Sequence, residues 1–191
     1  SNWYMRIISG SFRGKKIFEP RDKKTRPLKD LVKESIFNII NHSKKMNIEI
    51  SNSNILDLYS GVGSFGIECL SRGAEKVIFV ENYHKVLPIL KKNLSDLRTI
   101  NNYQILEFDI NKNFESKKIK DKFDIIFLDP PFKDKNLEEL LDNINKKNIL
   151  KKNGIIIIHR HKKENDSLPD SLKILDEKIY GISKITFSNF S

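Results

Sequence analysis

The segment best suited to a chemical reaction is Asp129-Pro130-Pro131-Phe132, which follows an apolar run. Two prolines keep the backbone extended and remove two N–H donors, so carbonyl oxygens are the backbone groups left to face a ligand. The amino group of a nucleic-acid base is a poor nucleophile because its lone pair is delocalised into the ring. The Asp129 carboxylate and a carbonyl near Pro130 could bind its two hydrogens and disperse the charge that develops on nitrogen.

Phe132 adds a flat face on which a base could stack, a contact worth about 1–3 kcal/mol. The catalytic residues predicted from this segment are therefore Asp129, Pro130, Pro131 and Phe132. A rigid strand-to-loop turn with a core phenylalanine would have the same sequence. The two interpretations are separated by the residues that precede this segment.

A glycine loop comes earlier in the chain, with Gly61, Gly63 and Gly66 spaced as G-x-G-x-x-G after an apolar run. Glycines let the backbone pass close to a ligand where a Cβ would collide, in dinucleotide folds and in tight turns alike. Asp57 lies four residues before the first glycine, where a carboxylate would repel a pyrophosphate and favour a cationic ligand. S-adenosylmethionine carries an ammonium and a sulfonium. We therefore expect Asp57, Tyr59, Gly61 and Gly63 to bind this cofactor, the alternative for Asp57 being a loop-capping role.

Two further strand ends carry acidic residues. Glu81, followed by Asn82, comes about 20 residues after the glycines, where a carboxylate can accept hydrogen bonds from both hydroxyls of a ribose. Asp109, followed by Ile110, could accept from an adenine amino group while an apolar neighbour packs on the ring. Each would be an ordinary strand end if it stood alone. In this order after Asp57, the four residues are expected to complete the cofactor site.

Alternating short apolar runs and helical patterns surround these residues. Continuous apolar strands between helices indicate a parallel sheet that is covered on both faces. We expect an α/β fold with a doubly wound, mostly parallel seven-stranded sheet, whose last two strands form an antiparallel pair at the edge. The expected strands are 55–59, 76–80, 103–108, 123–128, 154–159, 172–179 and 183–187, and the expected helices are 65–72, 83–97 and 137–150.

The first 45 residues are expected to form a basic extension (a hairpin at 5–18, a loop at 20–27 and a helix at 28–41) packed on a domain of residues 46–191. The net charge is +10, and residues 1–50 hold 12 basic against 5 acidic side chains. A concentrated basic face is typical of proteins that bind a polyanion, although a lysine-rich genome would also scatter lysines. The residues predicted to grip RNA phosphates are Arg6, Arg13, Lys15, Lys16 and Arg26.

Other compositional features narrow the function classes. Cys69 is the one cysteine, which excludes a disulfide framework, a multi-cysteine metal site and, by its distance from Asp129, a thiolate adduct with a base. His159-Arg160-His161 lacks further ligands at metal spacing, and Arg160 is expected to extend the basic face or to be solvated. No apolar stretch approaches the roughly 20 residues of a membrane span, and no signal core is seen. We expect a soluble cytoplasmic monomer without a metal.

With these motifs in place, nearly the whole chain resembles the bacterial small-subunit (16S) ribosomal RNA guanine-N2 methyltransferases. The resemblance implies a class I methyltransferase fold, N2-methylguanine in an rRNA hairpin loop as product, and ribosomal RNA or the small ribosomal subunit as partner. Its motifs are Arg6-Ile7-Ile8-Ser9-Gly10, Arg13-Gly14-Lys15-Lys16, Thr25-Arg26-Pro27, Val32-Lys33-Glu34-Ser35-Ile36-Phe37-Asn38, the Asp57 to Gly66 loop, Glu68-Cys69-Leu70-Ser71-Arg72-Gly73-Ala74 and Asp129-Pro130-Pro131-Phe132.

Two departures from the family pattern stand out. Family members usually have Thr or Ser where this chain has Leu28, and many have an acidic residue where it has His159-Arg160-His161. Neither is expected to touch the methyl-transfer site. Three other functions stay open: a DNA adenine-N6 or cytosine-N4 methyltransferase, a non-catalytic RNA-binding module on the same fold, and a Rossmann oxidoreductase.

Overall fold

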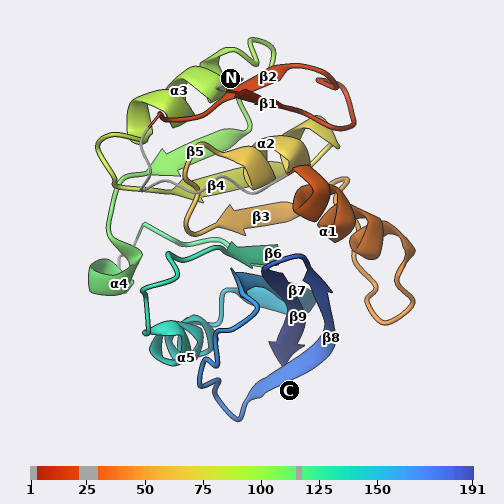
Figure 1. The fold of residues 1–191 in the computed structure, drawn as a ribbon, viewed down its shortest axis with the longest axis vertical. Helices are drawn as coiled ribbons and strands as arrows, with labels where there is room; N and C mark the ends of the chain where they lie inside the picture. The colour runs from red at the N-terminus through yellow and green to blue at the C-terminus, as the bar shows by residue number, and fades with distance from the viewer. Residues whose placement is uncertain (1–3, 22–29, 115–117) are drawn as a thin grey trace.

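The computed structural model describes residues 4–21, 30–114 and 118–191 (Figure 1). Within these residues the centre of the molecule is one seven-stranded sheet in the order β5-β4-β3-β6-β7-β9-β8. Its strands are β3 (Asn54–Asp57), β4 (Lys76–Val80), β5 (Tyr103–Leu106), β6 (Phe123–Leu128), β7 (Leu150–His161), β8 (Leu172–Tyr180) and β9 (Ser183–Phe190).

Helices cover both faces of this sheet. The buried apolar residues of α1 and α2, with Leu90 and Leu94 of α3, belong to one apolar cluster, and those of α4 and α5 belong to a second cluster on the other face. No helix among the described residues is long and apolar enough to span a membrane. The helices are α1 (Asp30–His42), α2 (Ser64–Ser71), α3 (Leu87–Ser95), α4 (Ile110–Asn113) and α5 (Leu137–Lys147).

The pairing of the strands explains where a site can form. β3 pairs in parallel with β4 and with β6, β4 pairs in parallel with β5, and β6 pairs in parallel with β7. The carboxyl ends of these five strands therefore meet at one edge of the sheet, where ligands bind in open α/β folds. β9 is antiparallel to both β7 and the edge strand β8. The predicted fold class, including the antiparallel pair at the edge, is confirmed.

Several boundaries differ from those expected. α5 ends at Lys147, because Asn148 adopts a left-handed conformation and Leu150 already starts β7. β7 is longer than predicted, since the pairing with β6 shifts register between Phe123 and Ile125 and admits the residues before Gly154. The short helix α4 was not expected at all. Its four residues are too few for a helical period to be recognised in the sequence.

The N-terminal hairpin is shorter than predicted, with β1 at Tyr4–Arg6 and β2 at Lys16–Phe18. The residues between them turn toward α2, where the Ser11 amide donates to the Ser71 carbonyl at 2.8 Å. Gly10 has a φ of +90°, and a Cβ there would collide with the Ser71 backbone. In Figure 1 the hairpin lies beside α3, at the β5 end of the molecule. Residues 22–27 of the expected loop and Leu28 lie outside the described residues.

A buried ion pair joins this extension to the core. The Lys33 ammonium of α1 lies 3.4 Å from the Glu68 carboxylate of α2, and both side chains are fully buried. Glu68 also accepts from the amides of Ile8 and Ser9 at 2.8 and 3.0 Å, and from Arg72 Nε at 2.8 Å. Burial lowers the pKa of Lys33, and Glu68 opposes that shift. One carboxylate thus holds the hairpin and two helices together.

Removing Glu68 should destabilise the protein far more than removing Lys33. Glu68→Ala removes the carboxylate that offsets a buried ammonium and accepts from two amides, a loss of about 3–5 kcal/mol in the free energy of unfolding. Lys33→Met should cost less, because Glu68 keeps Arg72 and the amides of Ile8 and Ser9. Urea denaturation measures both, with Glu34→Ala on the exposed side of α1 as a control that changes stability by about 0.5 kcal/mol or less. Equal losses from Glu68→Ala and Lys33→Met would contradict this role.

Candidate active site

The glycine loop runs from the end of β3 into α2 at the carboxyl edge of the sheet. Gly66 packs against the ring of Phe79 on β4, and a Cβ at Gly66 would collide with that ring. Gly63 has a φ of +91°, and an added Cβ would meet the side chains of Leu90 and Ile67. At Gly61, with a φ of +55°, a Cβ would meet nothing within 4 Å. Two of the glycines therefore serve packing, while Gly61 leaves open space beside the backbone.

Asp57, at the end of β3, is buried beside this loop. Its Oδ2 accepts from the Gly66 amide at 3.2 Å, whereas its Oδ1 has no hydrogen-bond partner among the described residues. Burial raises the pKa of Asp57, and the nearby carboxylates of Asp129 and Glu81 raise it further. A buried acceptor without a donor is costly, and a cationic ligand would satisfy it. This atom therefore fits the positively charged cofactor expected from the sequence.

Glu81 follows β4 and holds the same loop from the neighbouring strand. Its Oε1 accepts from the Gly61 amide at 2.8 Å. Its Oε2 accepts from the amides of Asn82 and Tyr83 at 3.1 and 3.0 Å. The three predicted cofactor residues Gly61, Glu81 and Asn82 are therefore brought together at one point, and Glu81 fixes the position of the loop.

A chain of hydrogen bonds continues from the glycine loop across α4. The Tyr59 hydroxyl donates to Asn111 Oδ1 at 3.1 Å, and Asn111 Nδ2 donates to Asp134 Oδ2 at 3.2 Å. Asp109 caps α4 by accepting from the Asn111 amide at 3.0 Å, while Ile110 is buried in the apolar cluster of that face. Asn111 was missed by the sequence analysis, because its role depends on a helix that the sequence did not reveal. It links the predicted cofactor residues to the loop that follows β6.

Asp129 stands directly after β6, between the strands that end at Asp57 and at His161. Its Oδ1 lies 2.8 Å from Nδ1 of His159, and its side chain is 11% exposed. Pro130 is buried, whereas Phe132 is half-buried and packs edge-on against the His161 ring with centroids 5.3 Å apart. The structure thus brings the predicted catalytic segment to the same edge as the glycine loop.

The expectation that Arg160 extends the basic face or is solvated is wrong. Its side chain is 2% exposed and forms a paired contact with both carboxylate oxygens of Asp166, at 2.9 Å each. Its guanidinium also donates to the carbonyls of Pro131 and Asp134, at 3.0 and 2.8 Å. An arginine can be buried here because all of these acceptors match its fixed fork of donors. The expectation that His159-Arg160-His161 does not touch the transfer segment is wrong as well.

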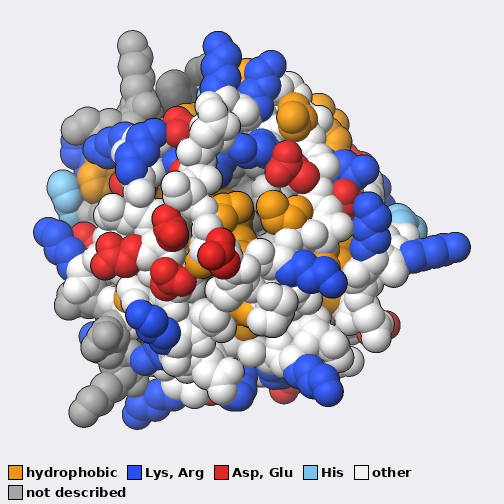
Figure 2. All heavy atoms as spheres, turned by 90° about the horizontal axis from the view of Figure 1, so that it is seen from below, with side chains coloured by type: hydrophobic (Ala, Val, Ile, Leu, Met, Phe, Trp, Pro, Cys, Tyr) orange, Lys and Arg blue, Asp and Glu red, His pale blue; other side chains and the backbone are white. Residues whose placement is uncertain are grey.

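Four of the predicted RNA-binding residues, Arg6, Arg13, Lys15 and Lys16, are exposed on the N-terminal hairpin. Lys15 donates to the Asp96 carbonyl at 2.9 Å, and the Lys16 ammonium lies 4.7 Å from the centre of the Tyr4 ring. Arg26 lies outside the described residues. The face at the other end of the sheet, shown in Figure 2, carries Lys and Arg side chains among acidic and apolar ones. Exposed cations thus occur at both ends of the sheet, and those of the hairpin are the ones predicted to bind RNA.

Cys69 lies on α2 and is fully buried. Burial raises the pKa of its thiol, and the carboxylates of Asp57 and Glu68 raise it further. A thiol in such surroundings is a poor source of thiolate. Within the described ranges, no cluster of three or more His, Cys, Asp or Glu side chains is placed to hold a metal ion.

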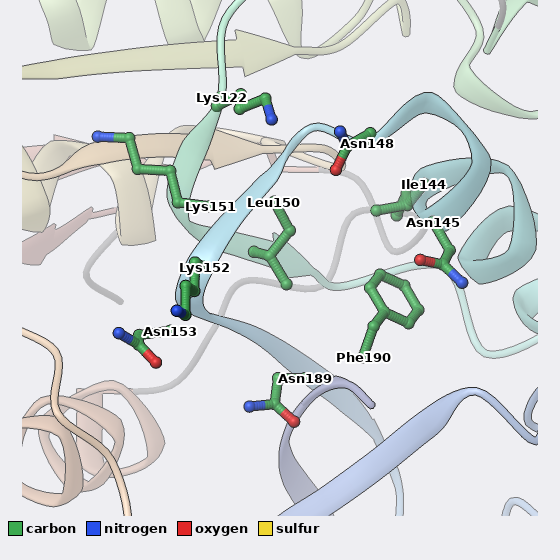
Figure 3. Close-up of a pocket in the computed structure, with 11 residues that line it drawn as sticks. Lys122, Ile144, Asn145, Asn148, Leu150, Lys151, Lys152, Asn153, Asn189 and Phe190 are labelled. Carbon is green, nitrogen blue, oxygen red and sulfur yellow. The ribbon is translucent and has the colours of Figure 1, made fainter.

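A cavity of about 430 Å³ lies at the opposite edge of the sheet (Figure 3). It is lined by residues at the start of β6 and β7 and at the end of α5, among them Lys122, Asn148, Lys151 and Lys152. None of the residues predicted to be catalytic or to bind the cofactor lines it. We therefore place the candidate active site at the carboxyl edge, where Asp57, Glu81 and Asp129 converge.

Comparisons with known proteins identify the family. The model of a protein family described as conserved hypothetical protein 95 matches residues 5–189. The ribosomal RNA small subunit methyltransferase D of Haemophilus influenzae is 34% identical over 184 residues, covering 93% of this chain and 90% of that protein. The protein of the same name from Buchnera aphidicola is 32% identical over 174 residues, covering 91% and 86%.

Solved structures give the same result. A candidate methyltransferase from Escherichia coli superposes with a TM-score of 0.80 at 27% identity, covering 98% of both chains. A candidate methylase from Haemophilus influenzae gives a TM-score of 0.74 at 32% identity, covering 97% of both chains. The sequence resemblance and the fold agree over nearly the full length. This chain belongs to the family described as conserved hypothetical protein 95, together with its relatives named ribosomal RNA small subunit methyltransferase D.

Proposed function

We propose that this protein transfers a methyl group from S-adenosylmethionine to the exocyclic N2 of a guanine in 16S ribosomal RNA. The observation that carries the proposal is the convergence of Asp57, Glu81 and Asp129 at one edge of the sheet. The first two hold or border the glycine loop, and the third begins the Asp-Pro-Pro-Phe segment. Membership of a family with rRNA methyltransferases supports both the donor and the kind of substrate.

The cofactor would be held by the ends of β3, β4 and β5. When bound, S-adenosylmethionine supplies an electrophilic methyl group on a sulfonium. Asp57 would offer its unpartnered Oδ1 to the cationic methionine part. Glu81 would accept from the ribose hydroxyls, and the main chain at Gly61 leaves room for close approach. Asp109 and Ile110 would border the adenine.

The amino group of the guanine would be aligned by the segment after β6. The Asp129 carboxylate and the Pro130 carbonyl accept its two hydrogens, so that the nitrogen lone pair faces the methyl carbon. This alignment would let the nitrogen take the methyl group in line as the thioether S-adenosylhomocysteine leaves, after which the nitrogen would lose one proton. Phe132 stacks on the base, which must first leave its own stack and rotate into the site. A single-stranded loop lowers the cost of that step.

Replacing Asp129 should strongly reduce methyl transfer while the cofactor still binds. Asp129→Ala removes one of the two acceptors that align the amino group, and loss of a group that stabilises developing charge costs about 10²–10³-fold in kcat. Incorporation of labelled methyl groups into small-subunit rRNA measures turnover, and calorimetry measures cofactor affinity. Asp121→Ala, an exposed change next to Lys76, is the matched control and should leave both unchanged. Unchanged turnover in Asp129→Ala would refute the role proposed for this residue.

Replacing Asp57 should stabilise the free protein and weaken cofactor binding. The folded state holds the Asp57 proton more tightly than the unfolded chain, because its pKa is raised. The charged carboxylate therefore costs stability above the unfolded pKa, and that cost disappears as the pH falls. Asp57→Asn should raise the Tm at neutral pH and weaken S-adenosylmethionine binding roughly 10- to 100-fold, the loss of a charged hydrogen bond.

The pH dependence of binding tests the same charge. In the unmodified protein, cofactor affinity should fall as the pH is lowered, because a protonated Asp57 no longer attracts the cation. In Asp57→Asn this part of the pH dependence should disappear. Calorimetry in buffers of different ionisation enthalpy would detect the proton released on binding. A lower Tm in Asp57→Asn together with an unaltered pH profile would argue against a cation at this carboxylate.

The hairpin cations should bind RNA through its phosphates. Each phosphate contact releases counterions, so affinity falls steeply with salt. Arg13→Ala and Lys16→Ala should each lower the slope of log affinity against log salt by about one. Fluorescence anisotropy with a small-subunit rRNA hairpin measures this slope. Lys173→Ala, exposed on the edge strand β8, serves as control and should keep it. A flat salt profile in the unmodified protein would mean that the hairpin has another use.

A further inference from the structure

Three neighbouring strands align a row of polar side chains that ends at Asp129. Leu128 of β6 pairs with Ile158 of β7, so the next residues, Asp129 and His159, lie side by side. His159 in turn pairs with Ile185 of β9, two residues beyond Ser183. The result is a continuous chain from Ser183 to Asp129 on one face of the sheet.

The contacts along this row are short and shielded from water. His159 Nδ1 lies 2.8 Å from Asp129 Oδ1, and His159 Nε2 lies 2.8 Å from Ser183 Oγ. The His159 side chain is 2% exposed, and Ser183 is 6% exposed. Both ring nitrogens are therefore engaged by the protein, and the imidazole is fixed in place.

The partners determine which nitrogen carries the proton. An ionised carboxylate can only accept, so Nδ1 must donate to Asp129. In a neutral imidazole the other nitrogen is then an acceptor, and the Ser183 hydroxyl donates to it. Asp129 thus selects the Nδ1–H form of His159, and Ser183 holds the ring in place through Nε2. A histidine is commonly oriented in this way, by the bond that its second nitrogen makes.

The two residues after His159 hold other parts of the same segment. Arg160 donates to the Pro131 carbonyl at 3.0 Å, and His161 packs edge-on against Phe132. Three consecutive residues at the end of β7 therefore contact the carboxylate, the backbone and the ring of the transfer segment. A reactive group is held in one precise position by supporting contacts of this kind from several of its neighbours.

We infer that His159 is a positioning residue for methyl transfer, which orients the Asp129 carboxylate toward the substrate amino group, and that Ser183 holds the His159 ring in the orientation that does so. The inference rests on the proposed function of Asp129. A misplacement of about 1 Å can cost on the order of 10²-fold in rate, so an anchor on this carboxylate affects turnover more than binding.

Three substitutions at His159 separate positioning from packing. The side-chain nitrogen of asparagine can take the place of Nδ1, whereas that of glutamine reaches toward the place of Nε2. His159→Asn should therefore keep the donor to Asp129 and retain most of the kcat. His159→Gln and His159→Ala should lower kcat about 10- to 100-fold, with KM for RNA and cofactor affinity changed less than about threefold.

Ser183 is tested against a matched serine of the same strand. Ser188 is buried, and its hydroxyl donates to the Ile156 carbonyl at 3.0 Å in the same pair of strands. Ser183→Ala should lower kcat several-fold and shift the ¹⁵N resonance of His159 Nε2, which loses its hydroxyl partner. Ser188→Ala should do neither. In the His159→Asn background, Ser183→Ala should add no further loss of kcat.

The outcomes distinguish this inference from the function on which it rests. If Asp129→Ala retains turnover, the proposed function fails first. If Asp129→Ala is inactive while His159→Ala and His159→Gln turn over like Ser188→Ala, the inference is overturned and the proposed function stands. Equal losses in His159→Asn and His159→Gln, with matching losses in Tm, would mean a packing role and would also overturn it.

Discussion

The central constraint on this structure is the clustering of three carboxylates at the carboxyl edge of its parallel strands. Asp57 ends β3, Glu81 and Asp129 directly follow the neighbouring strands β4 and β6, and burial of Asp57 next to the other two raises its pKa. Like charges in a partly dry site repel one another unless donors or cations offset them. The protein provides loop amides for Glu81 and an imidazole for Asp129. Asp57 Oδ1 is left without a partner among the described residues, which suits a cationic methyl donor.

This charged edge is kept in place from two sides. On one side, Glu68 binds Lys33 and the backbone of the hairpin, so the N-terminal extension is part of the same apolar core as α2. Asn93 of α3 joins them further, because its amide donates to the carbonyls of Phe18 and Val62 at 3.1 and 2.9 Å. Asn93 thereby joins Phe18 of β2 to Val62 of the glycine loop. The surface proposed to bind RNA is thus connected to the glycine loop through Asn93.

On the other side, the end of β7 holds the segment after β6. Arg160 is neutralised by Asp166 and still has donors left for two loop carbonyls. The same strand presents His159 to Asp129 on the opposite face of the sheet. Alternation of side chains along a strand makes this possible, since adjacent residues point to opposite faces. The end of β7 therefore holds the segment after β6 through contacts on both faces of the sheet.

Much of this arrangement could be predicted from the sequence. The remainder depends on the register in which the strands pair. Apolar runs with acidic or glycine-rich ends located β3, β4 and β6, and these placed Asp57, Glu81 and Asp129 at a common edge. The contacts of His159 and Arg160 could not be read in the same way, because they join residues about 30 positions apart. Only the pairing of Leu128 with Ile158 makes them neighbours. Alignment of the two strand ends would have been the available signal.

The helix α4 and its contact residue Asn111 were missed for a different reason. Four residues give no helical period, and the Asp109 cap looked like a cofactor contact alone. Conversely, Gly63 was expected to bind the cofactor, whereas Gly63 and Gly66 are both required by the side chains packed against them. Local patterns thus identified the site, whereas packing across the sheet determined how each residue serves it.

The central claim is that this edge methylates an exocyclic amino group in ribosomal RNA. The most direct test incubates the protein with unmodified small-subunit rRNA, and separately with DNA, in the presence of S-adenosylmethionine that carries a deuterated methyl group. Digestion to nucleosides and mass spectrometry then identify the labelled product. We predict labelled N2-methylguanosine from the RNA and no labelled product from the DNA. A labelled N6-methyladenine or N4-methylcytosine from DNA, or a methyl group on a ring carbon, would contradict the account.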